Sequence, residues 1–295
     1  MRVLDEPAVS ARLHMATLIP AIGRALRALA AGSVVQPVRT IVPIAEHRGF
    51  LGSMPAYVDG HLGVKLVTFY PHATGPHTHH AVILMFDAAT GAPQAMLDGR
   101  LITEMRTAAA SAVATDALAR RDAHVLAILG SGVQARSHLE AMRLVRDIRD
   151  VRVWSPRHAA TFARDHGVHA AASAEAAVRG ADIICVATSA QQPVLHGAWV
   201  APGAHINAVG ATRPDWRELD DALVARATLF VDSAEAATRE SGDVIAALAA
   251  GRTATEIGTV AEGASTRRGA DEVTLFKSVG VAVEDVASAV LVLGG

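Results

Sequence analysis

A strand, a glycine turn and a helix follow one another in the middle of the chain, and this feature constrains the fold most. Residues 125–129 form a short apolar run typical of a buried strand, and residues 133–145 have the pattern of a helix. In the GxGxxA sequence between them, Gly130 allows a tight turn, Gly132 lets the backbone approach a pyrophosphate, and Ala135 permits close packing of helix on strand. The segment therefore predicts a dinucleotide-binding unit. The residues expected to contact the dinucleotide here are Gly130, Gly132, Val133 and Gln134.

The same alternation of strand and helix continues along the chain. A second helix is expected at 158–166, and further strands are expected at 151–154, 183–187, 205–209 and 229–232. Strands that alternate with helices favour a parallel, doubly wound sheet of the Rossmann type. The fold class is therefore α/β.

The end of the second strand indicates which nicotinamide cofactor is preferred. NAD-selective enzymes usually place a carboxylate there for the ribose 2′-hydroxyl, but residues 155–158 contain none. Ser155, Arg157 and His158 stand in its place, and the Arg157 guanidinium can pair with a 2′-phosphate. We therefore predict NADPH, with NADH less favoured. The alternative is that Arg157 is an ordinary solvated residue at a helix start.

Two further loops follow strands at the edge of the sheet where ligands of such folds bind. They contain Thr188 and the segment from Val209 to Thr212. These residues are candidates for cofactor contacts. Small polar loop residues are also common without any such role, and the sequence leaves both interpretations open.

The remainder of the chain has a different texture. Short apolar runs at 64–69 and 81–86 read as strands, and 13–31 and 107–119 read as helices. A closing helix is expected at 281–293, and such a tail often packs back onto the N-terminal part. We therefore expect a discontinuous α+β domain, 1–118 with 265–295, beside a dinucleotide-binding domain, 119–264.

Composition excludes several classes of protein. Hydrophobic residues make up 51% and charged residues 19% of the 295 residues, so a large core is available and disorder is not expected. The formal net charge of −2 is unlike that of a nucleic-acid-binding protein. No apolar run reaches the roughly 20 residues of a membrane span, and the N-terminus lacks a signal-peptide pattern. The single cysteine, Cys185, permits no intrachain disulfide, so we expect a cytoplasmic protein.

Isolated basic residues mark the first segment. Arg39, Lys65 and Arg106 each lie among apolar or small residues. A buried cation needs an anionic partner, and three that converge would form a strong carboxylate site. Taken singly, each is more often an exposed charge or part of a structural ion pair, and sequence spacing does not distinguish these possibilities.

A histidine-rich stretch, His77 to His80, suggests a metal at first sight. The histidines are adjacent or two apart, and no cluster of cysteines or carboxylates completes a coordination sphere. We expect no metal and consider His79 a polar active-site residue.

Several ordered motifs resemble the ornithine cyclodeaminase/mu-crystallin family over essentially the whole chain. They lie at residues 36–40, 47–49, 54–57, 65–70, 96–99, 106–109, 130–135, 276–280 and 284–285. The resemblance implies a homodimer whose discontinuous domain forms the substrate site and the dimer interface. It implies that Arg39, Lys65 and Arg106 bind a substrate carboxylate, with Lys65, Arg106 and His79 catalytic. It also implies that Thr78 and His79 lie near substrate and nicotinamide, and that Ser278 contacts the nicotinamide.

One position distinguishes branches of the family. Ornithine cyclodeaminases carry a catalytic aspartate where this chain has Thr212. Cyclodeamination needs a base to activate the ornithine amine, and a threonine hydroxyl does not ionise near neutral pH. The resemblance is therefore to the ketimine reductase branch. It implies NADPH-dependent reduction of Δ1-pyrroline-2-carboxylate or Δ1-piperideine-2-carboxylate. Alternatives are an ornithine cyclodeaminase, an amino-acid or opine dehydrogenase, and an NADPH-dependent small-molecule-binding protein.

Overall fold

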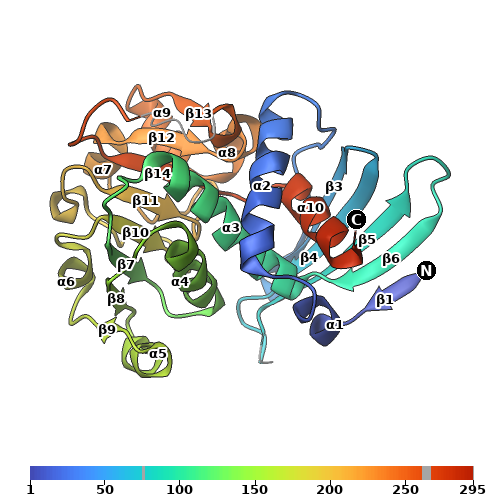
Figure 1. Cartoon of the computed structure of the whole chain (residues 1–295), viewed down its shortest axis with the longest axis horizontal. Helices are drawn as coiled ribbons and strands as arrows, with labels where there is room; N and C mark the ends of the chain where they lie inside the picture. The colour runs from blue at the N-terminus through green and yellow to red at the C-terminus, as the bar shows by residue number, and fades with distance from the viewer. Residues whose placement is uncertain (75–76, 261–266, 295) are drawn as a thin grey trace. The chain divides into compact units, whose positions relative to one another are not determined.

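Two compact units make up the computed structural model, which describes residues 1–74, 77–260 and 267–294 (Figure 1). Unit 1 is discontinuous and comprises Met1–Arg106 and Gly280–Gly295, and unit 2 comprises Thr107–Val279. Helix α3 (Arg100–Leu118) runs through the first boundary, which lies at residue 106 rather than at 118. The other boundary expected from the sequence, between 264 and 265, lies outside the described residues.

Unit 1 contains a six-stranded sheet in the order β1-β6-β5-β4-β3-β2. All neighbouring strands pair antiparallel except β1 and β6, which are parallel. The strands are β1 (Arg2–Leu4), β2 (Thr40–Ile44), β3 (Gly49–Val58), β4 (His61–Phe69), β5 (His79–Asp87) and β6 (Pro93–Asp98). The helices are α1 (Glu6–Ser10), α2 (Met15–Ala30) and α10 (Ala282–Leu293).

The core of unit 1 lies between the sheet and its helices. Figure 1 shows α10 beside α2 and against the sheet, and α10 contacts α2, β3, β4 and β5. In α2, Leu18, Ile22 and Leu26 recur at a spacing of four and are all buried, which is why this segment is an amphipathic helix. Because α10 is buried on most of its surface, any charged residue on it needs partners inside the unit.

Unit 2 contains an eight-stranded sheet, parallel throughout, in the order β13-β12-β14-β11-β10-β7-β8-β9. The strands are β7 (Val125–Leu129), β8 (Asp150–Trp154), β9 (His169–Ala170), β10 (Ile183–Val186), β11 (His205–Ala208), β12 (Thr228–Val231), β13 (Ala254–Glu256) and β14 (Thr274–Lys277). The helices that follow α3 are α4 (Val133–Val145), α5 (Ala159–His166), α6 (Ala174–Val178), α7 (Asp221–Arg226), α8 (Ala234–Glu240) and α9 (Gly242–Ala249). This architecture confirms the predicted α/β class with a Rossmann-type sheet.

The strand order places a topological switch point between β7 and β10. The chain runs outward from β7 to β8 and β9 on one side, then returns to β10 and β11 on the other. Loops at the carboxyl ends of these strands diverge there, and open α/β sheets bind their ligands at such points. The glycine turn after β7 lies at this position.

Strand β14 differs from the arrangement expected from the sequence. The expected domain of 1–118 with 265–295 includes this strand, but Thr274–Lys277 pairs with both β11 and β12 inside the parallel sheet. All four residues are buried. Chain continuity therefore brings Ser278, which follows β14, to the carboxyl edge of the same sheet. No helix in the described part of the chain is long and apolar enough to cross a membrane.

Candidate active site

The glycine turn after β7 has the backbone that a dinucleotide site requires. Gly130 has φ +118°, and a Cβ there would overlap the carbonyl oxygen of Ala187. Gly132 is exposed, and a Cβ there would meet no atom within 4 Å. No side chain of a described residue caps the N-terminus of α4, so its first amides are available to an anion. The turn therefore fits a pyrophosphate group. Val133 is exposed and Gln134 is half-buried at the start of this helix.

The two glycines are expected to fail differently when replaced by alanine. Gly130→Ala creates an overlap and a strained positive φ, so we expect a lower melting temperature as well as loss of cofactor binding. Gly132→Ala has room in the unliganded protein, and its methyl group blocks only the approach of the pyrophosphate. We expect a melting temperature near that of the wild type and a cofactor Kd raised by at least about tenfold. Calorimetry and cofactor titration measure both quantities, and equal melting temperatures for the two variants would contradict this account.

Past β8, Ser155 organises the turn that begins α5. Its hydroxyl is 2.8 Å from the Ser131 hydroxyl and accepts a hydrogen bond from the backbone N–H of His158 at 3.1 Å. Arg157 and His158 are exposed. No hydrogen bond or ion pair joins Arg157 to another described residue, so its guanidinium is available to a ligand at this edge.

The candidate residues in the later loops lie at the same edge of the sheet. Thr188 follows β10 and is half-buried, and its hydroxyl donates to Glu218 at 2.7 Å. Val209 and Thr212 follow β11 and are half-buried. Ser278 is 1% exposed and donates its hydroxyl proton to Asp232 at 2.8 Å, which leaves the Ser278 oxygen able to accept a hydrogen bond.

Unit 1 brings the three isolated cations together. Arg39 donates from Nη2 to the carbonyl oxygen of Gly280 at 2.7 Å. Gly280 has φ +77°, and a Cβ there would overlap the guanidinium of Arg106. The two arginines therefore meet at Gly280, which must lack a side chain for Arg106 to lie where it does.

Two carboxylates on α10 complete this cluster. Asp285 lies between two of the cations, with Oδ2 at 2.6 Å from Lys65 Nζ and Oδ1 at 3.3 Å from Arg106 Nε. Glu284 Oε2 accepts from Arg106 Nη1 at 2.9 Å. Lys65, Arg106, Glu284 and Asp285 are each no more than 5% exposed. We refer to Arg39, Lys65, Arg106, Glu284 and Asp285 as the charged cluster.

Residues 284–285 belong to one of the motifs that resemble the family, but the sequence did not predict a role for them in the site. A signal was available, because two adjacent carboxylates interrupt an otherwise apolar helix. Buried carboxylates need cationic partners.

Burial and charge alter two titrating groups of unit 1. Burial is the largest cause that lowers the pKa of Lys65 to about 8; Arg106 and Arg39 add to it, and Asp285 opposes it. His79, at the start of β5, has its pKa lowered to about 4 by desolvation and then by the charges of Lys65 and Arg106. His79 and its neighbour Thr78 nevertheless keep access to solvent. At neutral pH the Lys65 ammonium is therefore largely protonated, and the His79 ring is neutral.

The histidine-rich stretch lies at the start of β5. Nowhere in residues 1–74, 77–260 and 267–294 do three His, Cys, Asp or Glu side chains lie close enough to hold a metal ion. The histidine rings contact aromatic neighbours instead: His79 packs edge-on against Phe69, and His77 against His80.

Known proteins with this fold and these motifs include reductases of cyclic imines. The model of the ornithine cyclodeaminase/mu-crystallin family matches residues 2–294. Ketimine reductase mu-crystallin of Macropus fuliginosus is 46% identical over 288 residues, which cover 93% of this chain and 90% of that protein.

Two solved structures are also similar over the whole length of the chain. The Δ1-pyrroline-2-carboxylate reductase of Thermococcus litoralis, in complex with NADH and L-proline, has a TM-score of 0.93 and 39% identity and covers 100% of this chain and 97% of its own. An archaeal alanine dehydrogenase dimer with bound NAD has a TM-score of 0.92 and 33% identity and covers 100% and 95%. With the glycine turn, the cations and the family motifs in one continuous match, the chain belongs to the ornithine cyclodeaminase/mu-crystallin family.

Proposed function

We propose that the protein reduces a cyclic imine bearing a carboxylate at C2, Δ1-pyrroline-2-carboxylate or Δ1-piperideine-2-carboxylate, to L-proline or L-pipecolate with NADPH. The observation that carries this proposal is the charged cluster of unit 1. The Thermococcus reductase with bound NADH and L-proline supports it as a relative of the same fold. In this proposal unit 1 binds the substrate and unit 2 binds the cofactor.

The formal charges of the cluster match a monocarboxylate. The five side chains of the charged cluster, three cations and two buried carboxylates, carry a formal charge of +1 in total. A substrate with a single carboxylate neutralises it. Guanidinium groups bind carboxylates through paired, charge-assisted hydrogen bonds, which also fix the orientation of the ring that carries the carboxylate. Thr78 and His79, at the start of β5, are proposed to border the same pocket.

Reduction of the C=N bond adds a proton to nitrogen and a hydride to C2. NADPH, when bound, supplies the hydride and leaves as NADP⁺. We assign the proton to Lys65, because its pKa of about 8 keeps it protonated at neutral pH and makes it a competent acid. His79, with a pKa of about 4, is a neutral imidazole at pH 7 and lacks the acidic proton of an imidazolium. His79 is therefore assigned to contacts with substrate and nicotinamide.

For the cofactor, the glycine turn is proposed to hold the pyrophosphate, and Ser155, Arg157 and His158 the 2′-phosphate. Arg157 is exposed at the end of β8, where no carboxylate competes for it. Thr188, Val209 and Thr212 are proposed to line the nicotinamide end. The Ser278 oxygen, with its proton donated to Asp232, is proposed to accept from the carboxamide.

Two observations of unit 1 and of the sequence bear on assembly and location. Apolar side chains are exposed on one face of the six-stranded sheet, including Val42, Leu51, Tyr57 and Val82. We propose that a second copy covers this face in a homodimer, as exposed apolar patches often mark interfaces. A solution mass of a single chain by light scattering would contradict it.

The one buried cysteine suits the cytoplasm, which subcellular fractionation of the native host tests.

The direct test is oxidation of NADPH in the presence of each cyclic imine. We expect turnover of at least one, and kcat/KM at least about tenfold higher with NADPH than with NADH. Ornithine, and a screen of 2-oxo acids with amines, are run in parallel. Ammonia release from ornithine with no imine turnover would contradict the assignment, as would preferred turnover of a 2-oxo acid. Tight NADPH binding without turnover of any substrate would favour a binding protein instead. Comparable values with the two cofactors would contradict the role of Arg157.

A further inference from the structure

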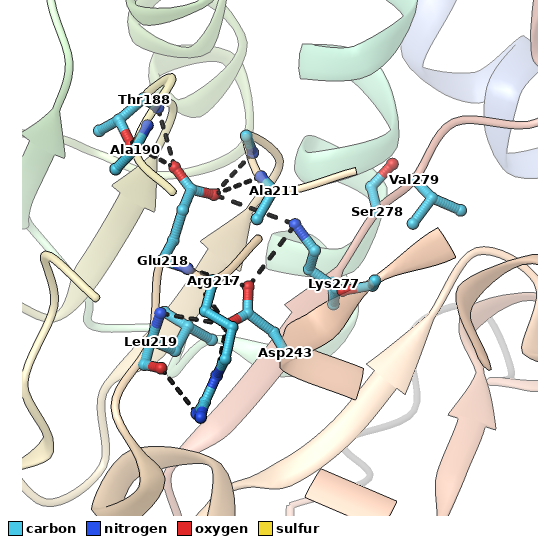
Figure 2. A network of polar contacts seen from close by, with 12 residues as sticks. Thr188, Ala190, Ala211, Arg217, Glu218, Leu219, Asp243, Lys277, Ser278 and Val279 are labelled. Carbon is cyan, nitrogen blue, oxygen red and sulfur yellow. Dashed lines mark hydrogen bonds and ion pairs between the residues drawn. The ribbon is translucent and has the colours of Figure 1, made fainter. Parts of the chain in front are cut away.

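A buried carboxylate ties together two loops at the cofactor edge of unit 2. Glu218, which lies between β11 and α7, is 0% exposed. Its Oε1 accepts from the backbone N–H and the hydroxyl of Thr188, at 3.0 and 2.7 Å. Its Oε2 accepts from the backbone N–H groups of Gly210 and Ala211, at 2.7 and 3.0 Å. Figure 2 shows the Glu218 carboxylate between Thr188 and Ala211.

The loops joined in this way follow neighbouring parallel strands. Thr188 lies just past β10, and Gly210 and Ala211 just past β11. A Cβ on Gly210 would overlap the carbonyl oxygen of Thr188, and a Cβ on Gly130 would overlap that of Ala187. The loops after β7, β10 and β11 thus pack backbone against backbone. A shift of one loop therefore displaces the loop beside it. The glycine turn, which follows β7, is one of these three loops.

A buried lysine lies beside Glu218 and a second carboxylate, Asp243, and offsets part of their negative charge. Lys277 Nζ lies 3.9 Å from Glu218 Oε2 and 4.0 Å from Asp243 Oδ2, and all three side chains are buried (Figure 2). Among the described residues Lys277 Nζ has no closer hydrogen-bond partner. Asp243 accepts from the backbone N–H groups of Glu218 and Leu219, at 3.2 and 3.1 Å, and no hydrogen bond joins it to a described residue of either loop.

Burying these two carboxylates costs desolvation free energy, so their presence suggests a specific role. Burial raises the pKa of both Glu218 and Asp243, and the Lys277 ammonium acts in the opposite direction. A glutamine could not replace Glu218. Its side-chain amide has one acceptor oxygen, and its NH2 group is a donor that would face the donors of one loop. Only an anion with two acceptor oxygens satisfies four donors from two loops.

We infer that Glu218 is a positioning residue for the nicotinamide cofactor, which holds the loops 187–190 and 209–212 in their cofactor-binding conformation without contacting the cofactor. The inference rests on the cofactor part of the proposed function and not on the imine. Without the carboxylate, either the Gly210 and Ala211 N–H groups or the Thr188 N–H and hydroxyl lose their acceptor. The loop that contains them is then no longer held in place.

The test is a titration of the Glu218→Gln variant with NADPH and with NADH, in which protein fluorescence reports cofactor binding. We expect the Kd of both cofactors to rise by at least about tenfold, because two hydrogen bonds to a charged acceptor are lost from one loop. At saturating cofactor we expect kcat within about threefold of the wild type, since the reacting groups are unchanged. The change therefore falls on cofactor Kd and KM rather than on kcat.

Asp243→Asn is the matched control. It removes an equally buried charge beside the same lysine but no bond to either loop. We expect it to lower the melting temperature as Glu218→Gln does and to leave the cofactor Kd within about twofold of the wild type. Equal rises in Kd for the two variants, or an unchanged Kd for Glu218→Gln, would overturn the inference.

A double variant keeps the test open if Glu218→Gln does not fold. Glu218→Gln combined with Lys277→Met removes the buried ammonium together with the carboxylate, and the same rise in Kd is expected. A wild-type protein that binds neither cofactor would overturn this inference and the proposed cofactor together. Failure to reduce either imine, with cofactor binding intact, would overturn only the proposed substrate.

Discussion

Replacing Lys65 by arginine is expected to lower kcat for imine reduction by at least about a hundredfold, the usual contribution of a positioned general acid. Arginine keeps the positive charge and can still pair with Asp285, so KM for the imine should change by less than about tenfold. It does not release a proton at any accessible pH. Steady-state kinetics with saturating cofactor measures both constants. A wild-type kcat in Lys65→Arg would exclude Lys65 as the proton donor.

The pH dependence of kcat/KM tests the same assignment independently. The protonated form of Lys65 is the active one, so kcat/KM is retained below the pKa of Lys65 in the free enzyme and lost above it. Because burial lowers this pKa from 10.5 to about 8, kcat/KM of the wild type should fall about tenfold per pH unit above pH 8. Lys65→Arg, whose guanidinium stays protonated, should show no such fall. A descending limb shared by both proteins would instead belong to the substrate or to another group.

The parts of the fold that could be predicted from the sequence are those determined locally. Strand β7 and helix α4 have the bounds expected from the apolar run and the helical pattern, 125–129 and 133–145. Strand β14 could not be placed in this way. Its neighbours β11 and β12 precede it by many residues, and the pairing depends on how the whole sheet is assembled.

The cations of the charged cluster could be predicted from the sequence, but their convergence could not. Arg39, Lys65 and Arg106 stand out as isolated cations, but their convergence depends on contacts far along the chain. Arg106 pairs with Glu284 across 178 residues, and Arg39 with Gly280 across 241. No spacing rule connects such positions. The two adjacent carboxylates on an apolar helix were the available indication. Because a buried carboxylate needs a cationic partner, they could have been matched to the isolated cations.

Glu218 could not be identified from the sequence for a different reason. In residues 212–220 the position that stands out is Thr212, where an ornithine cyclodeaminase is expected to carry an aspartate. The hydrogen bonds that Glu218 accepts from the two loops come mostly from backbone N–H groups. Backbone partners leave no trace in the sequence, so the structure alone reveals them.

Loss of either arginine should abolish recognition of the substrate carboxylate. For Arg39→Met and Arg106→Met we expect kcat/KM with the carboxylated imine to fall by at least about a hundredfold, the cost of removing one partner of a charge-assisted pair. The cofactor Kd should stay within about twofold of the wild type, since the glycine turn is unchanged. The two variants differ in stability. Arg106→Met leaves Glu284 and Asp285 with less compensation and should cost about 3–5 kcal/mol of unfolding free energy.

Arg39→Met is the decisive variant, because Arg39 is only half-buried and its removal disturbs the fold less. The unsubstituted cyclic imine Δ1-pyrroline, which lacks the carboxylate, provides the control within the same protein. The wild type should reduce it far more slowly than the carboxylated imine, and Arg39→Met should reduce it at a rate within a few-fold of the wild type. The selectivity for the carboxylate, taken as the ratio of the two kcat/KM values, should therefore collapse. If both imines slow equally in Arg39→Met, Arg39 supports the structure of the site and does not bind the carboxylate.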